Sequence, residues 1–276
     1  MTVYEKAYAK INLYLDVTGR RDDGFHDILS VMHSVSLCDE LALTAEDSDI
    51  IDITITSDDK SLEVDKNNLI YKAALKYLSY FDISAKICVD LIKRIPIGAG
   101  LGGGSSDAAA TLRAMNRIFG LASKDQLLEI AEGIGSDVPF CLIGGCAICK
   151  GKGEKITPFK VDFCKNVVIA IGESRVSTPK AYSLLDEKYG DFKSYVQQNK
   201  CFEMRCIPVY NIFESVIDLD DVINIKNIMS NSEAEYTLMS GSGPSVFGLF
   251  KRPYAASRAM EALEKAGFTA FQCELI

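Results

Sequence analysis

The sequence contains no run of about 18 apolar residues, which is the length that a membrane-spanning helix requires. Its first residues do not join a basic stretch to an apolar segment, so we expect no secretory signal peptide. Basic residues are also in deficit, because 30 Lys and Arg face 38 Asp and Glu and leave a net charge of −8. Since no Lys/Arg run offsets this charge, nucleic-acid binding is not expected. We expect a cytoplasmic protein without membrane or nucleic-acid partners.

In other respects the composition is that of an ordinary globular protein, with 276 residues of which 48% are hydrophobic and 25% charged. That length allows one large domain or two moderate ones, each able to bury a core. The nine cysteines are odd in number and lie mostly in apolar runs, as expected for buried thiols in a reducing cytosol. Cys146 and Cys149 have a metal-ligand spacing, but without a second such pair they do not predict a metal site.

The hydrophobic pattern predicts a mixture of strands and helices. Residues 7–17 alternate as a strand does, residues 67–81 have helical spacing, and residues 85–95 form a strand rich in β-branched side chains. We expect a loop at residues 135–140, because the residue before a proline avoids the helical conformation. The stretch 192–231 is expected to be mainly helical.

Short polar loops near Lys150–Glu154 predict a domain boundary, which we place between residues 155 and 156. Both halves, 1–155 and 156–276, mix helix and strand without regular βαβ alternation. This pattern predicts two α+β domains.

The most informative segment is a glycine loop, residues 96–106, which places five glycines and two serines within nine residues just before a helical pattern. Glycine lets the backbone adopt positive φ and come close to a ligand. The serines are expected to cap the following helix, whose N-terminus attracts anions. The loop is therefore predicted to bind phosphate groups. The expected binding residues are Pro96, Gly98, Ala99, Gly100, Leu101, Gly102, Gly103, Gly104, Ser105 and Ser106.

The segment does not match other known classes of glycine-rich loop as well. It lacks the G-x-x-x-x-G-K-[ST] spacing of a P-loop. Gly98, Gly100 and Gly103 match the dinucleotide fingerprint, but that fold needs a second strand where residues 125–133 read as a helix. Protein kinases are excluded because no His-Arg-Asp or Asp-Phe-Gly follows.

Three further features are ambiguous when each is taken alone. Lys10 and Asn12 share the polar face of the first strand, where a lysine is more often a solvated surface residue. Asp137 lies in a loop, where an aspartate more often forms a turn. Gly241–Pro244 is equally compatible with a simple turn between strands. Their combination with the glycine loop changes this interpretation.

The Ala-Lys strand, the Pro-x-Gly-Ala-Gly-Leu-Gly-Gly-Gly-Ser-Ser loop and the late Gly-Ser-Gly-Pro-Ser loop, in this order, resemble the GHMP small-molecule kinase superfamily. Within it, residues 9–26 closely resemble the 4-diphosphocytidyl-2-C-methyl-D-erythritol kinases. Residues 135–140 and 176–182 are similar to that family as well. The resemblance implies an N-terminal ribosomal-S5-domain-2-like domain and a C-terminal ferredoxin-like α+β domain, with the active site in the cleft between them.

The resemblance also implies an activity. Members of this family use ATP and Mg²⁺ to phosphorylate the 2-hydroxyl of 4-diphosphocytidyl-2-C-methyl-D-erythritol, a step of non-mevalonate isoprenoid synthesis. Asp137 is implied as the catalytic carboxylate and Lys10 as its cationic partner. Ser105 or Ser106 is a candidate Mg²⁺ ligand. The partner is a small molecule, and the protein is expected to be a monomer or a homodimer.

The substrate residues implied by the same resemblance are Asn12, Phe25, His26, Thr178 and Pro179. The family usually has tyrosine where Phe25 stands, so the stacking face is kept and the hydroxyl is lost. Asn67, Asn68 and Lys93 are candidate neighbours of the adenine.

Two alternatives remain at this point. One is another kinase of the superfamily, acting on homoserine, mevalonate or a sugar; Phe25 and His26 argue against it, because those substrates carry no base. The other is a regulator that binds ATP without catalysis. The presence of both Lys10 and Asp137 argues against that interpretation.

Overall fold

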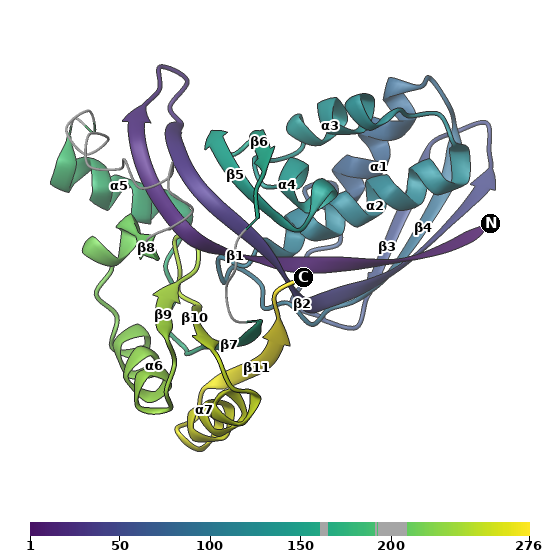
Figure 1. Ribbon diagram of the computed structural model, residues 1–276. Coiled ribbons are helices and arrows are strands. Elements are labelled where there is room, and N and C mark those ends of the chain that lie inside the picture. Colours follow the sequence, from purple (N-terminus) through teal and green to yellow (C-terminus); the bar gives the residue numbers. More distant parts are fainter. Residues whose placement is uncertain (161–164, 191, 193–208) are drawn as a thin grey trace. The chain divides into compact units, whose positions relative to one another are not determined.

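The structure, a computed structural model, describes residues 1–160, 165–190, 192 and 209–276, which form helices and two β-sheets (Figure 1). The elements in chain order are β1 (Thr2–Arg20), β2 (His26–Asp47), β3 (Asp52–Ser57), α1 (Leu69–Tyr80), β4 (Ala85–Ile92), α2 (Gly103–Phe119), α3 (Lys124–Glu132), α4 (Val138–Ile143), β5 (Cys146–Gly151), β6 (Lys155–Pro158), β7 (Asn166–Ile171), α5 (Thr178–Tyr189), β8 (Tyr210–Asn211), the 3₁₀ helix η4 (Ile212–Ser215), α6 (Asp220–Asn231), β9 (Tyr236–Met239), β10 (Val246–Phe250), α7 (Pro253–Lys265) and β11 (Thr269–Glu274).

The chain divides into two compact units, each assembled from several segments. Unit 1 comprises Met1–Ala9, Cys38–Ile97 and Gly102–Gly144, and unit 2 comprises Lys10–Leu37, Gly98–Leu101 and Gly145–Ile276. This division differs from a single boundary between residues 155 and 156. The reason is that β1 and β2 are strands of 19 and 22 residues, long enough to contribute to both units. Independent domains at 1–155 and 156–276 remain a prediction.

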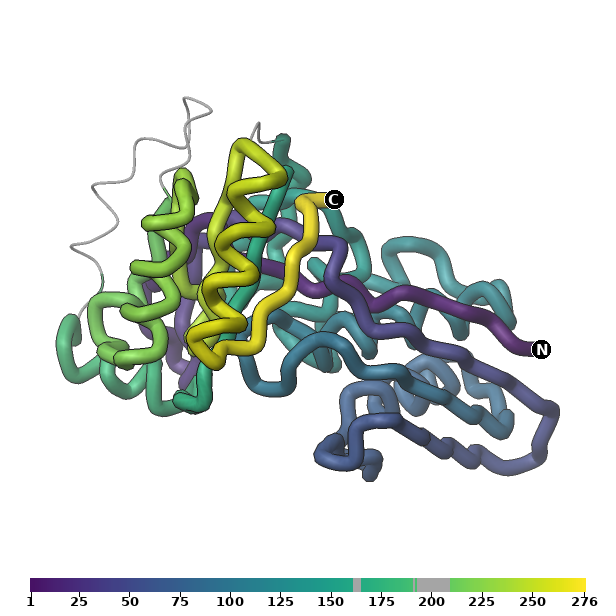
Figure 2. Tube along the Cα trace, turned by 90° about the horizontal axis from the view of Figure 1, so that it is seen from below, coloured from purple at the N-terminus to yellow at the C-terminus, as the bar shows by residue number. Residues whose placement is uncertain are grey.

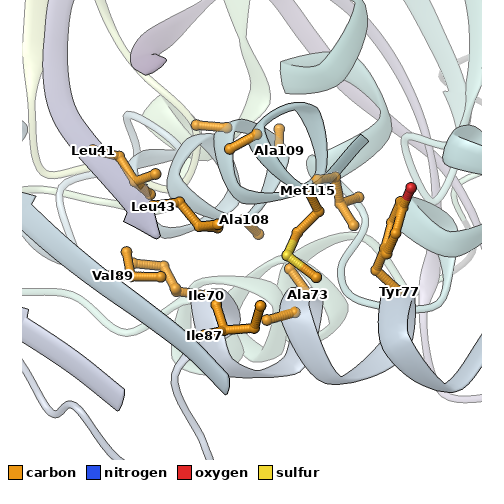
Figure 3. Close-up of a cluster of buried hydrophobic side chains, with 14 of the residues drawn as sticks. Leu41, Leu43, Ile70, Ala73, Tyr77, Ile87, Val89, Ala108, Ala109 and Met115 are labelled. Carbon is orange, nitrogen blue, oxygen red and sulfur yellow. The ribbon is translucent and has the colours of Figure 1, made fainter. Parts of the chain in front are cut away.

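The larger sheet has seven strands in the order β3-β4-β2-β1-β8, with β5 pairing to β2 and β6 to β5. Helices α1 and α2 pack on its β2–β4 region, and Figure 3 shows their side chains meeting. Ile70 and Tyr77 of α1 face Ala108 and Met115 of α2, and all four are buried. Burying a large apolar side chain of this kind stabilises the fold by about 1.5–3 kcal/mol. This core supports the helix that follows the glycine loop.

The second sheet lies within unit 2, has four strands in the order β11-β7-β10-β9, and is antiparallel throughout. Its central strand β7 is apolar and almost wholly buried. Helices α6 and α7 pack on one side of the sheet (Figures 1 and 2).

Two local predictions need correction. Residues 135–140 are not all loop, because α4 begins at Val138, with Pro139 in its first turn. Proline is tolerated there because the first N–H groups of a helix have no intrahelical acceptor. The stretch 192–231 is expected from the sequence to be mainly helical. Residues 193–208 lie outside the described residues, and Tyr210–Asn211 form a strand rather than a helix. No helix in the described part of the chain is long and apolar enough to cross a membrane.

Candidate active site

Lys10 is buried, with only 4% of its surface exposed, so its interpretation as a solvated surface lysine is wrong. Both faces of β1 are covered from Ala9 to Val17, and the polar side chains on one face therefore need polar partners. Lys10 Nζ donates to Asn12 Oδ1 at 2.8 Å. Asn12 Nδ2 donates in turn to Ser30 Oγ at 2.9 Å, which fixes the amide with its oxygen toward the ammonium. The strand thus holds a desolvated positive charge in a defined position.

The first part of the glycine loop belongs to unit 2 and is held by a second loop, Ser240–Ser245. Ser240 Oγ donates to the Gly100 carbonyl at 3.1 Å, and Ser245 Oγ donates to the Ala99 carbonyl at 2.5 Å. The Leu101 carbonyl accepts the backbone N–H of Lys10 at 2.9 Å. Three consecutive carbonyls of the loop therefore point at protein partners.

Asn12 and Gly100 bring these segments together. Asn12 Oδ1, which accepts from Lys10, also accepts the Gly241 N–H at 3.0 Å. Gly100 has φ +78°, and a Cβ placed on it would overlap the Ser240 carbonyl oxygen. Unit 2 thus brings together the lysine strand, the glycine loop and the Gly-Ser-Gly-Pro loop. The bond between Asn12 and Gly241 joins residues that are 229 positions apart in the sequence.

The second part of the glycine loop lies in unit 1 and starts α2. The residue that caps α2 is Gly102, with φ +71°, and no side chain caps the helix, so the expected serine caps are wrong. Ser105 and Ser106 lie inside the first turn instead. Ser106 is buried and donates its hydroxyl to the Tyr8 carbonyl at 2.5 Å. This hydrogen bond from the Ser106 hydroxyl attaches the start of α2 to β1.

Asp137 occupies the N-cap position of α4 and is half-buried. Its carboxylate makes no capping hydrogen bond to α4 in the described structure. Its backbone carbonyl accepts the Cys141 N–H at 3.0 Å, which fixes the main chain from which the side chain projects.

His26 is buried rather than exposed in a turn, and it contacts α5. Its Nε2 lies 2.7 Å from Asp186 Oδ1, and its ring stacks on Tyr182 with centroids 4.7 Å apart. Tyr182 and Asp186 are four residues apart and share one face of the helix. Neither Tyr182 nor Asp186 was identified as a site residue from the sequence. The available signal was their spacing of four residues, which places them on one helix face just after the predicted substrate residues Thr178 and Pro179.

The other predicted substrate residues of unit 2 lie at the start of α5 and on the turn before β2. Thr178 Oγ1 lies 3.0 Å from Ser242 Oγ, and Pro179 is in the first turn of α5. Phe25 is 54% exposed, and Lys152 Nζ lies 4.9 Å from the centroid of its ring. A ring with this much exposed surface can stack on a planar ligand.

A buried ion-pair cluster of unit 1 was not predicted. Lys93 Nζ pairs with an oxygen of Asp39 and, at 2.9 Å, with Asp107 Oδ2. Burial raises the pKa of Asp107 to about 7. Burial lowers the pKa of Lys93, but the two carboxylates outweigh this effect and leave it raised. The Lys93 ammonium is thus paired with carboxylates, and Asn68 caps α1. Contacts of Asn67, Asn68 and Lys93 with the adenine remain a prediction.

Asp107 is expected to make the stability of the protein fall as the pH rises. Its pKa is raised in the folded state from 3.8 to about 7. Between these values the unfolded chain releases a proton that the folded protein retains, so the free energy of unfolding decreases with rising pH and levels off above the folded pKa. Denaturant titrations at pH 5 and pH 8 should show a larger loss for the wild type than for Asp107→Asn. Equal losses of unfolding free energy in the two proteins would contradict the raised pKa of Asp107.

Comparison with known proteins assigns the family. Residues 68–145 match the GHMP kinases N terminal domain, and residues 219–269 match the GHMP kinases C terminal domain. A 4-diphosphocytidyl-2-C-methyl-D-erythritol kinase of Caldicellulosiruptor saccharolyticus is 41% identical over 268 residues, covering 94% of this chain and 92% of that protein. The chain belongs to this kinase family. The Bacillus subtilis member is 38% identical over 273 residues, covering 95% of this chain and 93% of its own length.

Solved structures agree with this family assignment. A crystal structure of 4-(cytidine 5'-diphospho)-2C-methyl-D-erythritol kinase matches with a TM-score of 0.79 at 32% identity, covering 99% of both chains. A homoserine kinase from Cytophaga hutchinsonii matches with a TM-score of 0.71 at 21% identity, which reflects the shared fold. The predicted α+β fold of the GHMP kinases is confirmed, and this member of the 4-diphosphocytidyl-2-C-methyl-D-erythritol kinase family is an ATP-dependent small-molecule kinase.

Proposed function

We propose that this kinase transfers the γ-phosphoryl group of ATP to the 2-hydroxyl of 4-diphosphocytidyl-2-C-methyl-D-erythritol, a step of non-mevalonate isoprenoid synthesis. The supporting observation is the joining of the Lys10 strand, the glycine loop and the Ser240–Ser245 loop in unit 2 by Asn12 and Gly100. Because ATP is available inside the cell, we place the enzyme in the cytoplasm, as a monomer or a homodimer that acts on a small molecule.

In this proposal Asp137 orients the acceptor hydroxyl and takes its proton as the oxygen attacks the γ-phosphorus. The bond from that phosphorus to the ADP oxygen breaks as the new bond forms. Lys10 stabilises negative charge on the transferring group. Its ammonium is suited to this role because Asn12 holds it in place and protein covers it from water, which strengthens its field.

The glycine loop is proposed to bind the triphosphate. Its carbonyls at Ala99, Gly100 and Leu101 accept hydrogen bonds from protein donors, which holds the loop backbone in place. Its N–H groups are the backbone groups that can bind an anion. The first N–H groups of α2 and the positive end of its dipole add to this attraction.

Mg²⁺ is proposed to arrive with the triphosphate. Among the described residues no group of three or more His, Cys, Asp or Glu side chains is arranged to hold a metal ion. Mg²⁺ does not need such a cage, because it keeps several waters and uses phosphate oxygens as ligands. Of the two candidate serines, Ser105 fits better, since the Ser106 hydroxyl is buried and bonded to Tyr8. When bound, the ion would neutralise charge on the phosphates.

The cytidine end is proposed to be bound by Phe25, through stacking, and by His26, through its imidazole. Asp186 accepts from Nε2 when that nitrogen carries the proton, which leaves Nδ1 as an acceptor. An acceptor at this point matches the exocyclic amino group of cytosine. Asn12, Thr178 and Pro179 are proposed to contact the methylerythritol portion.

We expect His26→Ala to lower kcat/KM for the cytidyl substrate by ~1–3 kcal/mol, or about 5- to 150-fold, because a base hydrogen bond is lost and its partner is left unpaired. The KM for ATP should stay nearly unchanged. His33→Ala is the matched control, since His33 is the other histidine of the chain, lies on the same strand and is equally buried. Equal effects of the two substitutions would remove His26 from base recognition.

The function itself is tested by measuring ADP release with a panel of acceptors. The panel contains the cytidyl substrate, methylerythritol phosphate without the cytidyl group, homoserine, mevalonate and a sugar. We expect rapid release with the cytidyl substrate alone. Equal turnover of homoserine or of the truncated acceptor would reduce the assignment to a broader kinase activity. ATP binding without ADP release from any acceptor would favour a regulator.

A further inference from the structure

The buried cluster of Asp39, Lys93 and Asp107 connects the two ends of the glycine loop. Asp39 is on β2, Lys93 follows β4 just before the loop, and Asp107 is in the first part of α2 just after it. The exposed fractions of the three side chains are 0%, 5% and 3%. Lys93 Nζ binds both carboxylates at once. One ammonium therefore joins the strand before the loop to the helix after it.

Asp39 also holds the backbone that enters the loop. Its Oδ1 accepts the N–H of Arg94 at 2.5 Å and the N–H of Ile95 at 2.8 Å. Residue 96 begins the loop directly after these two amides. The carboxylate of Asp39 thus fixes the entry of the loop, while its other oxygen binds the lysine that holds the exit at Asp107.

Gly103 shows how closely the entry and the exit approach each other. A Cβ on Gly103 would lie 3.0 Å from Ile95 Cγ2 and 3.1 Å from Lys93 Nζ. Both distances are shorter than ordinary contacts with a Cβ atom, so a larger residue would require Ile95, Lys93 or α2 to shift by a few tenths of an ångström. The start of α2 therefore rests directly on the cluster.

A buried ion pair is a poor device for stability alone, because desolvation of the charges cancels much of their attraction. It does define geometry, because charge-assisted hydrogen bonds hold their partners at fixed distances and angles. A loop that is already ordered loses less conformational entropy when a ligand binds. These considerations favour a role in shaping the loop over a role in general stability.

We propose that Asp39, Lys93 and Asp107 form a clamp that closes the base of the glycine loop and positions it to bind the phosphates of ATP. They are positioning residues, which act on the nucleotide through the loop. The inference rests on the proposed nucleotide role of that loop.

The test compares Asp107→Ala with Met115→Ala, a core substitution two turns further along α2 that leaves the clamp intact. Calorimetry with ATP and Mg²⁺, without acceptor, should give a Kd at least about 10-fold higher for Asp107→Ala. The KM for the acceptor should not change, and kcat at saturating ATP should stay within about 3-fold of wild type. Met115→Ala lowers the melting temperature through its cavity but should leave the Kd for ATP unchanged. Asp107→Asn, whose Oδ1 can still accept from Lys93, should restore most of the affinity.

A Kd for ATP that rises no more in Asp107→Ala than in Met115→Ala would overturn the clamp. The same conclusion follows if acceptor KM and ATP Kd rise together, because a general loss of structure predicts that. If Asp107→Ala does not fold, Asp107→Ser replaces it in the same comparison of ATP affinities, because serine places a hydroxyl near Lys93. A wild-type enzyme that binds no ATP would instead refute the proposed function, so the two failures are distinguishable.

Discussion

Asp137→Asn is expected to lower kcat by ~10²–10⁴-fold while the fold and the affinity for ATP are retained. The amide keeps the shape of the side chain but cannot take a proton from the acceptor hydroxyl. The Asp137 carbonyl accepts a hydrogen bond from the Cys141 N–H, which holds the backbone and is not touched by the substitution. The loss should therefore appear in kcat rather than in the melting temperature.

Single-turnover kinetics with saturating ATP and acceptor measure this effect directly. Asp125→Asn is a suitable control, because Asp125 is an exposed aspartate in the first turn of the neighbouring helix α3. The control should retain wild-type turnover. If Asp137→Asn kept more than about a third of wild-type kcat, this carboxylate would not be part of the chemical step.

Gly100→Ala is expected to remove most of the affinity for ATP. Its backbone has φ +78°, a conformation that costs an L-residue roughly 1–2 kcal/mol, or about 5- to 30-fold in an equilibrium constant. The added Cβ would also overlap the Ser240 carbonyl oxygen, which is backbone and cannot rotate away. Relief requires the glycine loop to leave the Ser240–Ser245 loop, and the loss of affinity should exceed about 30-fold.

Gly98→Ala provides the matched control for this substitution. Gly98 also has a positive φ, +68°, but a Cβ there would meet nothing within 4 Å. Its effect should be limited to backbone strain. Calorimetric ATP affinities that were equal for the two variants would mean that contact between the two loops does not shape the binding site.

Local patterns in the sequence determined much of this protein. The alternation of residues 7–17 gave a strand, the spacing of residues 67–81 gave α1, and β-branched residues before the glycine loop gave β4. These predictions succeeded because helix and strand periodicities are properties of neighbouring residues. The glycine loop was recognisable for the same reason, since positive φ at Gly98 and Gly100 is a local backbone requirement.

Tertiary structure alone decided which polar side chains are buried and what they contact. Lys10 has the pattern of a surface lysine, yet it lies beneath protein and bonds to Asn12. His26 meets Asp186 across 160 residues of sequence, and Lys93 meets Asp39 across 54. A periodic pattern carries no information about such partners, because it records which face of an element is polar and not what packs against that face. The physical reason is that a buried polar group must find a hydrogen-bond partner, and the fold, not the neighbouring sequence, supplies it.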